Sequence, residues 1–169
     1  MVPLTRQARI PATLPGTVMQ ELIRYLAIDT RSELLAERLW YLLEGSADTI
    51  IADFYNRTRQ SSAGIMLDEL TIERLRARQK QHWHSLFSSG FDEQYARSVS
   101  MIGLKHHEIG LDSKWYIAGY ATIKAAFAEK IMEAPLPLKA KTALIITLEK
   151  YVAIDMALAL SAYSAWLVD

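Results

Sequence analysis

Apolar residues recur at intervals of three and four along most of this 169-residue chain, and this spacing constrains the fold more than any other feature. Side chains three and four positions apart share one face of an α-helix, whereas a half-buried strand needs apolar and polar residues in alternation. The prolines and most of the glycines stand between the periodic segments. Strands are hard to place anywhere, so the sequence predicts an all-α fold.

Breaks in the periodicity indicate where the helices begin and end. The first residues carry prolines and arginines without an apolar run, so we expect a loose arm over 1–15 and a single domain over 16–169. Asp112 or Ser113 is expected to cap a helix that ends at about Glu133. A corner is expected at Gly45 and Ser46. The other expected helices cover about 17–28, 33–44, 47–59, 67–87, 91–109 and 138–168.

The composition limits the class of protein. The chain is long enough to bury one core and to enclose a pocket for a ligand of cofactor size. Nineteen Lys and Arg balance nineteen Asp and Glu without a long block of either sign, which argues against a nucleic-acid partner. The sequence has no cysteine, and therefore no disulfide framework or thiolate metal site, which fits a reducing cytoplasm.

The last expected helix, 138–168, is apolar on nearly all sides. Between Tyr151 and Val168 the only charged residue is Asp155. These residues would span about 27 Å, nearly a bilayer, but Ala and Ser are frequent and a carboxylate is present, so we expect no membrane span. A soluble helix of this kind needs more covering than a small domain supplies, which predicts an oligomer interface. It reaches Asp169 without a Gly or Pro stop, as if it once continued into something else.

The expected helix 67–87 carries one amide within its apolar stripe. Leu75 and Trp83 lie on this stripe, and Gln79 stands between them. A single polar residue in such a place is most often satisfied by a neighbouring backbone group. The alternative is that Gln79 donates to a molecule bound in a pocket.

His106 closes the apolar stripe of the expected helix 91–109. At 100° per residue, this stripe falls within about 80° of the helical wheel and consists of Tyr95, Val99, Ile102, His106 and Ile109. His107 points elsewhere, on the side of Ala96 and Gly103. A lone His on an apolar face is most often a core residue bonded to a backbone carbonyl. Neutral imidazole is also the usual proximal ligand of haem iron, which is the functional alternative.

The residues around His106 carry a resemblance to a known family. The run HHEIGL from His106, followed by WYIAGY from Trp115, resembles the proximal histidine motif of the globin-coupled sensors, which are related to protoglobins. The run DFY that ends at Tyr55 is similar to the family's Phe-Tyr near the end of its second main helix. The run QHW that ends at Trp83 is similar to the family's distal helix. In order and approximate spacing, the resemblance covers about 21–166.

The resemblance implies a globin fold with an extra N-terminal helix and a noncovalently held b-type haem. It implies a homodimer formed through a bundle of the last two long helices. It also implies that O2 or another diatomic gas, CO or NO, binds on the distal side of the haem. The final helix would then signal to a linked output domain: a chemotaxis transducer, a diguanylate cyclase or a histidine kinase. None of these output domains is present in this chain.

In this family the ligating histidine stands where His106 stands, so the resemblance implies that His106 binds the haem iron. Tyr55 would reach the distal side, where its hydroxyl could stabilise the partial negative charge of O2, with Gln79 in support. The residues expected to line the haem are Tyr55, Leu75, Gln79, Trp83, Val99, Ile102, His106, Ile109 and Tyr120.

Two other functions compete with a gas sensor. One is a helical interaction module without a cofactor, in which His106 is an ordinary core residue. The other is a haem enzyme, which we rank lowest because no second distal histidine or acid–base pair is evident. His82 and His84 lie off the stripe of the expected distal helix. We therefore expect no enzymatic activity.

Overall fold

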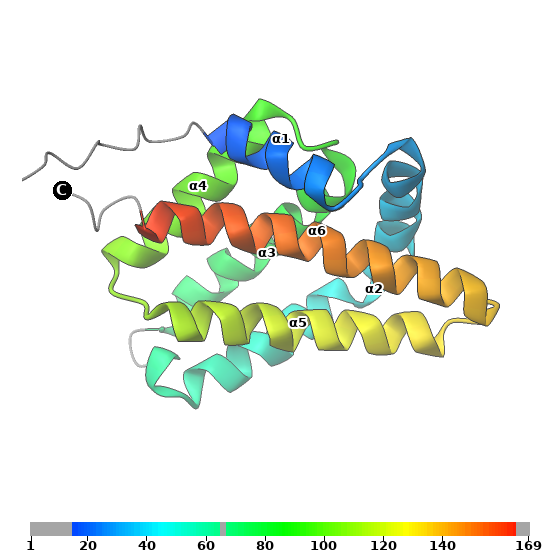
Figure 1. Ribbon diagram of the computed structural model, residues 1–169. Coiled ribbons are helices and arrows are strands. Elements are labelled where there is room, and N and C mark those ends of the chain that lie inside the picture. Colours follow the sequence, from blue (N-terminus) through cyan, green and yellow to red (C-terminus); the bar gives the residue numbers. More distant parts are fainter. Residues whose placement is uncertain (1–14, 65–66, 165–169) are drawn as a thin grey trace, which may run out of the picture.

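The structure, a computed structural model, describes residues 15–64 and 67–164 and contains there only helices, without a strand (Figure 1). This confirms the all-α fold. Most of the expected N-terminal arm and the end of the expected final helix lie outside the described residues, although Pro15 already belongs to the first helix. The elements are α1 (Pro15–Tyr25), α2 (Thr30–Arg59), the short 3-10 helix η1 (Ser62–Gly64), α3 (Glu69–Ser88), α4 (Glu93–Glu108), α5 (Ser113–Glu133) and α6 (Leu138–Ser164).

Aspartates mark where four of these helices begin. The side chains of Asp29, Asp68, Asp92 and Asp112 each accept a hydrogen bond from a backbone N–H in the first turn of α2, α3, α4 and α5. Each such cap satisfies a donor that the helix itself leaves unpaired and contributes about 1 kcal/mol. Of the two candidate caps for α5, the structure uses Asp112. Gly110, just past α4, has a φ of +73°, as expected for a C-terminal cap.

The predicted corner at Gly45 and Ser46 is wrong, because α2 runs unbroken from Thr30 to Arg59. A glycine inside a helix costs about 1 kcal/mol relative to alanine. Here the buried face continues in helical register on both sides of Gly45, through Leu43 and Ala47, and neither side chain is exposed. Packing of this continuous face outweighs the local cost of the glycine.

The terminal helix α6 lies at the centre of the domain. It packs on α4, α5, α2, α1 and α3, and Figure 1 shows it antiparallel to α5. Helix α1 lies across α4 and α6 and is the extra N-terminal helix that the resemblance implied. In the described part of the chain, no helix combines the length and the hydrophobicity that a membrane span requires.

Helices of the same domain cover most of the apolar surface of α6. Its buried side chains are Leu144, Thr147, Leu148, Tyr151, Val152, Ile154, Asp155, Leu158 and Ala159. Ile146 is 49% exposed, and on the neighbouring helix α5 Ile117 and Met132 are 47% exposed. The hydrophobicity of α6 therefore does not by itself require a second copy of the chain, and the dimer stays a prediction.

Helix α4 lies very close to the backbone of α6 at Gly103. A Cβ atom added there would collide with the backbone carbonyl of Ala159, so only glycine permits this crossing. Ala96, on the same side of α4, is also buried. Ala96, Gly103 and His107 were expected on one side of this helix. That side packs against the rest of the domain at Ala96 and Gly103, whereas His107 is exposed.

Matched glycine-to-alanine substitutions test this crossing. We expect Gly103→Ala to lower the free energy of unfolding by about 1–3 kcal/mol, because the added methyl group has to push two helix backbones apart. Gly45→Ala, which places the methyl group in open space, should raise it by about 0.5–1 kcal/mol. Urea unfolding followed by circular dichroism measures both values. Equal stabilisation by the two substitutions would contradict the close crossing.

Candidate functional site

His106 lies in the last turn of α4 with its imidazole half-buried. Its Nδ1 donates a hydrogen bond to the backbone carbonyl of Ile102, with a distance of 2.7 Å between nitrogen and oxygen. Burial lowers the pKa of His106, which favours the neutral ring. A neutral ring with its proton on Nδ1 presents the lone pair of Nε2. A core histidine makes the same bond to a carbonyl, and so does a histidine that binds a metal through Nε2.

Two tyrosines of α5 join His106 to α3, the helix expected from the sequence to be distal. The ring of Tyr116 lies edge-on to His106, with 5.1 Å between ring centroids. The hydroxyl oxygens of Tyr116 and Tyr120 are 3.1 Å apart, and the Tyr120 ring lies 5.9 Å from that of Trp83. Tyr120 was expected from the sequence at this site, whereas Tyr116 appeared there only as part of the motif. An aromatic wall therefore connects α4 with α3.

The expected distal residues form a small hydrogen-bonded cluster. Tyr55 of α2 is only 7% exposed, and burial raises its pKa to about 12, although its bond with the Gln79 side chain opposes this shift. The Tyr55 hydroxyl therefore keeps its proton at neutral pH and can donate a hydrogen bond. The indole N–H of Trp83 donates to Oε1 of Gln79 at 3.3 Å. The partners of Gln79 are thus side chains rather than the backbone group considered from the sequence.

The remaining expected residues take different positions. Val99 is fully buried on α4, and Ile102 and Leu75 are half-buried. Ile109, in contrast, is 68% exposed. Ile109 follows the last residue of α4 and its backbone N–H still bonds to the carbonyl of Lys105, but its side chain is largely uncovered at this end of the helix. Its position gives no support to a role at this site.

These residues fit a haem better than a bare metal ion. Among the described residues, no group of three or more His, Asp or Glu side chains is placed to hold an ion. Haem iron needs only one protein ligand on its proximal side, and a single neutral imidazole beside an aromatic and apolar wall meets that need. Helices α3 and α4, which carry Trp83 and His106, each pack on α6 and do not pack extensively on each other in the described part of the chain.

A buried polar cluster around Asp155 lies behind this wall and was not predicted from the sequence. Asp155 of α6 is completely buried and accepts hydrogen bonds from the hydroxyls of Tyr95 and Tyr120. Its Oδ2 also lies 2.8 Å from Nε2 of His82. The available signal was that Asp155 is the lone charge in an apolar stretch, but the sequence offered no partner for it. His82 was set aside because it lies off the expected stripe.

The surroundings of Asp155 favour an ion pair with His82. Burial alone would raise the pKa of Asp155, but the charge of His82 and the three hydrogen bonds bring it below its usual value. Burial alone would lower the pKa of His82, and the carboxylate of Asp155 raises it instead. Burial also raises the pKa of Tyr95 and of Tyr120 well above the ordinary value, so both hydroxyls remain donors.

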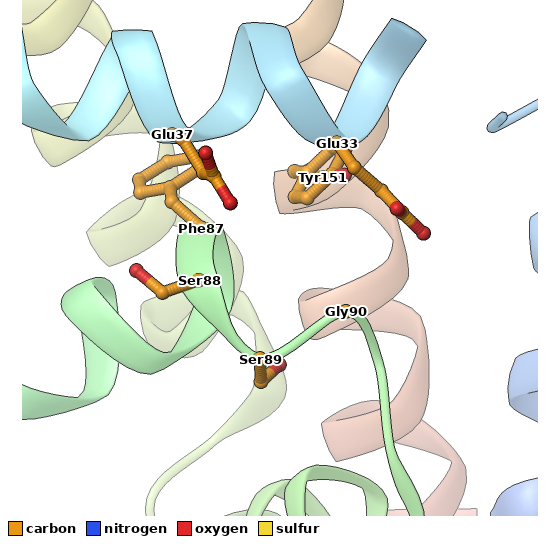
Figure 2. A pocket seen from close by; sticks show the side chains of 7 residues that line it. All are labelled: Glu33, Glu37, Phe87, Ser88, Ser89, Gly90 and Tyr151. Carbon is orange, nitrogen blue, oxygen red and sulfur yellow. The ribbon is translucent and has the colours of Figure 1, made fainter. Parts of the chain in front are cut away.

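Two surface pockets lie away from these residues. The first, shown in Figure 2, is lined by Glu33, Glu37, Phe87, Ser88, Ser89, Gly90 and Tyr151. The second is an apolar groove between the first half of α2 and the turn that joins α5 to α6. Neither pocket contains a residue expected from the sequence to line the haem.

Known structures share this arrangement of helices. The chain is similar to the globin domain of a Geobacter sulfurreducens globin-coupled sensor, with a TM-score of 0.78 and 18% identity over 86% of this chain and 97% of that one. It is also similar to the ferric globin domain of E. coli DosC, with a TM-score of 0.68 and 12% identity over 88% of this chain and 99% of that one. At these identities the likeness shows the fold, which confirms the expected globin fold.

A family model shows more than the fold. The model that describes protoglobins matches residues 17–167, which is nearly the whole chain. The match includes every residue of the site described above. The chain therefore belongs to the protoglobin family.

Proposed function

We propose that this chain is a haem-based sensor domain that binds O2 or another diatomic gas and signals through its C-terminal helix. The observation that carries the proposal is the environment of His106: its Nδ1 is bonded to the carbonyl of Ile102, and burial lowers its pKa, which favours the neutral ring whose Nε2 lone pair can bind a metal. Membership of the protoglobin family supports it, as does the likeness to the globin domain of a globin-coupled sensor.

Each part of the site has a role in this proposal. Haem b would supply an iron atom that binds a diatomic gas. His106 would hold this iron through Nε2, with its ring oriented by the bond to the carbonyl of Ile102. Tyr55, held by Gln79, donates a hydrogen bond to a ligand that carries partial negative charge. Leu75, Trp83 and Val99 exclude water, which strengthens that bond.

The packing of α4 supports a signalling role for α6. The helix that carries His106 contacts α6 directly, because Gly103 of α4 packs against the backbone of Ala159. A displacement of α4 would therefore move α6 without an intervening element. We propose that an output domain follows α6 in the parent protein. We further propose that the exposed apolar residues of α5 and α6, Ile117, Met132 and Ile146, contribute to a homodimer interface.

The alternative is a cofactor-free helical interaction module. The bond between His106 and Ile102 favours it to the extent that a core histidine would make the same contact. We propose no enzymatic activity, because the candidate acid–base pair His82–Asp155 is buried and its two groups are bonded to each other. Peroxide turnover no faster than that of free haem would agree with this view.

Alanine substitution of the two adjacent histidines tests the haem ligand. The purified protein should show a strong Soret absorbance, and a ferrous spectrum that changes on addition of CO. His106→Ala should lose this absorbance because the axial nitrogen is gone, whereas His107→Ala, in which an exposed imidazole is removed, should retain it. A colourless protein that takes up no haem would instead support the interaction module.

Removal of one hydroxyl tests the distal assignment. We expect Tyr55→Phe to speed O2 dissociation about tenfold to a hundredfold, because a hydrogen bond to a charged acceptor contributes roughly 1.5–3 kcal/mol. The release of CO, which is less polar, should change much less. Tyr41→Phe on the same helix, where the side chain is 81% exposed, is the matched control. Stopped-flow measurements that gave equal acceleration for both gases would remove Tyr55 from this role.

A further inference from the structure

One carboxylate of the terminal helix binds side chains from three other helices. Asp155 on α6 is completely buried and is bonded to His82 of α3, Tyr95 of α4 and Tyr120 of α5. The three partners lie 73, 60 and 35 positions away in the sequence. A single carboxylate group therefore links α6 to three other helices.

Stability alone is a weak reason for such a centre. Taking a carboxylate out of water is costly, and well-packed apolar residues often replace a buried ion pair without loss of stability. The neighbours of Asp155 along α6, Ile154 and Leu158, are apolar and buried, so the core around α6 is otherwise built from apolar side chains at these positions. Hydrogen bonds are directional, so the carboxylate holds each of its three donor side chains in a defined position.

The donor that matters most here is Tyr120. Its hydroxyl is bonded to Asp155 and lies 3.1 Å from that of Tyr116, whose ring touches His106. Its ring lies against Trp83, which is bonded to Gln79 of the distal cluster. Tyr120 therefore reaches the proximal side of the candidate haem site through Tyr116 and contacts the distal side at Trp83, and Asp155 holds it from α6.

We propose that Asp155 is a positioning residue of the haem site, which it couples to the terminal helix α6 through Tyr120. The inference rests on the proposed haem-binding function. Coupling of this kind is reciprocal: a change at the haem site alters the bonds of Asp155, and a change at Asp155 alters the haem site. Helix α6 is thereby linked to the haem site at two places: through Asp155 and Tyr120, and through its backbone contact with α4 at Gly103.

The first test replaces the charge and keeps the shape. Asp155→Asn should shift the iron–histidine stretching band in the resonance Raman spectrum of the ferrous protein. It should also change the O2 dissociation rate about twofold to thirtyfold, the range in which mutations along coupling networks act. Glu149→Gln, which removes a carboxylate of α6 that pairs with Lys124 on the surface, should leave both measurements unchanged.

Two tyrosine variants separate positioning from general loosening. Tyr120→Phe should reproduce the band shift of Asp155→Asn, and the double variant should add little to either, because both remove the same link. Tyr95→Phe also removes one bond to Asp155, but it leaves Tyr120 in contact with Trp83 and Tyr116, so its shift should be smaller. If Asp155→Asn does not fold, Tyr120→Phe decides the matter, since it removes a single oxygen atom.

The outcomes distinguish this inference from the proposed function. A wild-type protein that takes up no haem overturns both. A different result would overturn only the positioning role. In that case the wild-type protein binds haem through His106, but the Asp155 and Tyr120 variants lower the unfolding midpoint without shifting the iron–histidine band from its position in Glu149→Gln. Equal shifts for Tyr95→Phe and Tyr120→Phe would also overturn the route through Tyr120.

Discussion

The burial of α6 among the other helices is the constraint on which the rest of this structure depends. An apolar helix has to be covered over most of its surface, and here α1, α2, α3, α4 and α5 share that task. Each of them is thereby placed relative to α6, and α3 and α4 need no extensive contact with each other in the described part of the chain. The arrangement of the candidate site on α3, α4 and α5 is a consequence of this common support.

Among the residues that the structure describes, Asp155 of α6 is the one buried side chain that carries a charge. This carboxylate is stable there because His82 supplies an opposite charge and two tyrosines supply hydrogen bonds. One of these tyrosines, Tyr120, forms the aromatic wall beside His106 together with Tyr116 and Trp83. Electrostatics in the core and the geometry of the candidate haem site are therefore parts of one arrangement.

Local signals in the sequence predicted much of the fold. The start of α5 follows from Asp112, which caps its first turn, and Gly110 after α4 has the positive φ of a C-terminal cap. The corner at Gly45 failed because the preference of one residue was outweighed by the packing of a whole face of α2. Ile109 falls on the stripe of α4 on the helical wheel, but its side chain is exposed at the end of the helix.

The sequence by itself determined the helical character of the chain, the place of His106 near a helix end and the inward orientation of Tyr55, because these depend on residues a few positions apart. Only the tertiary structure decided that Gln79 lies between Tyr55 and Trp83, that Tyr116 and Tyr120 link His106 to α3, and that Asp155 has three partners. Those contacts depend on how helices cross, and helix crossing is decided by the shapes of whole faces.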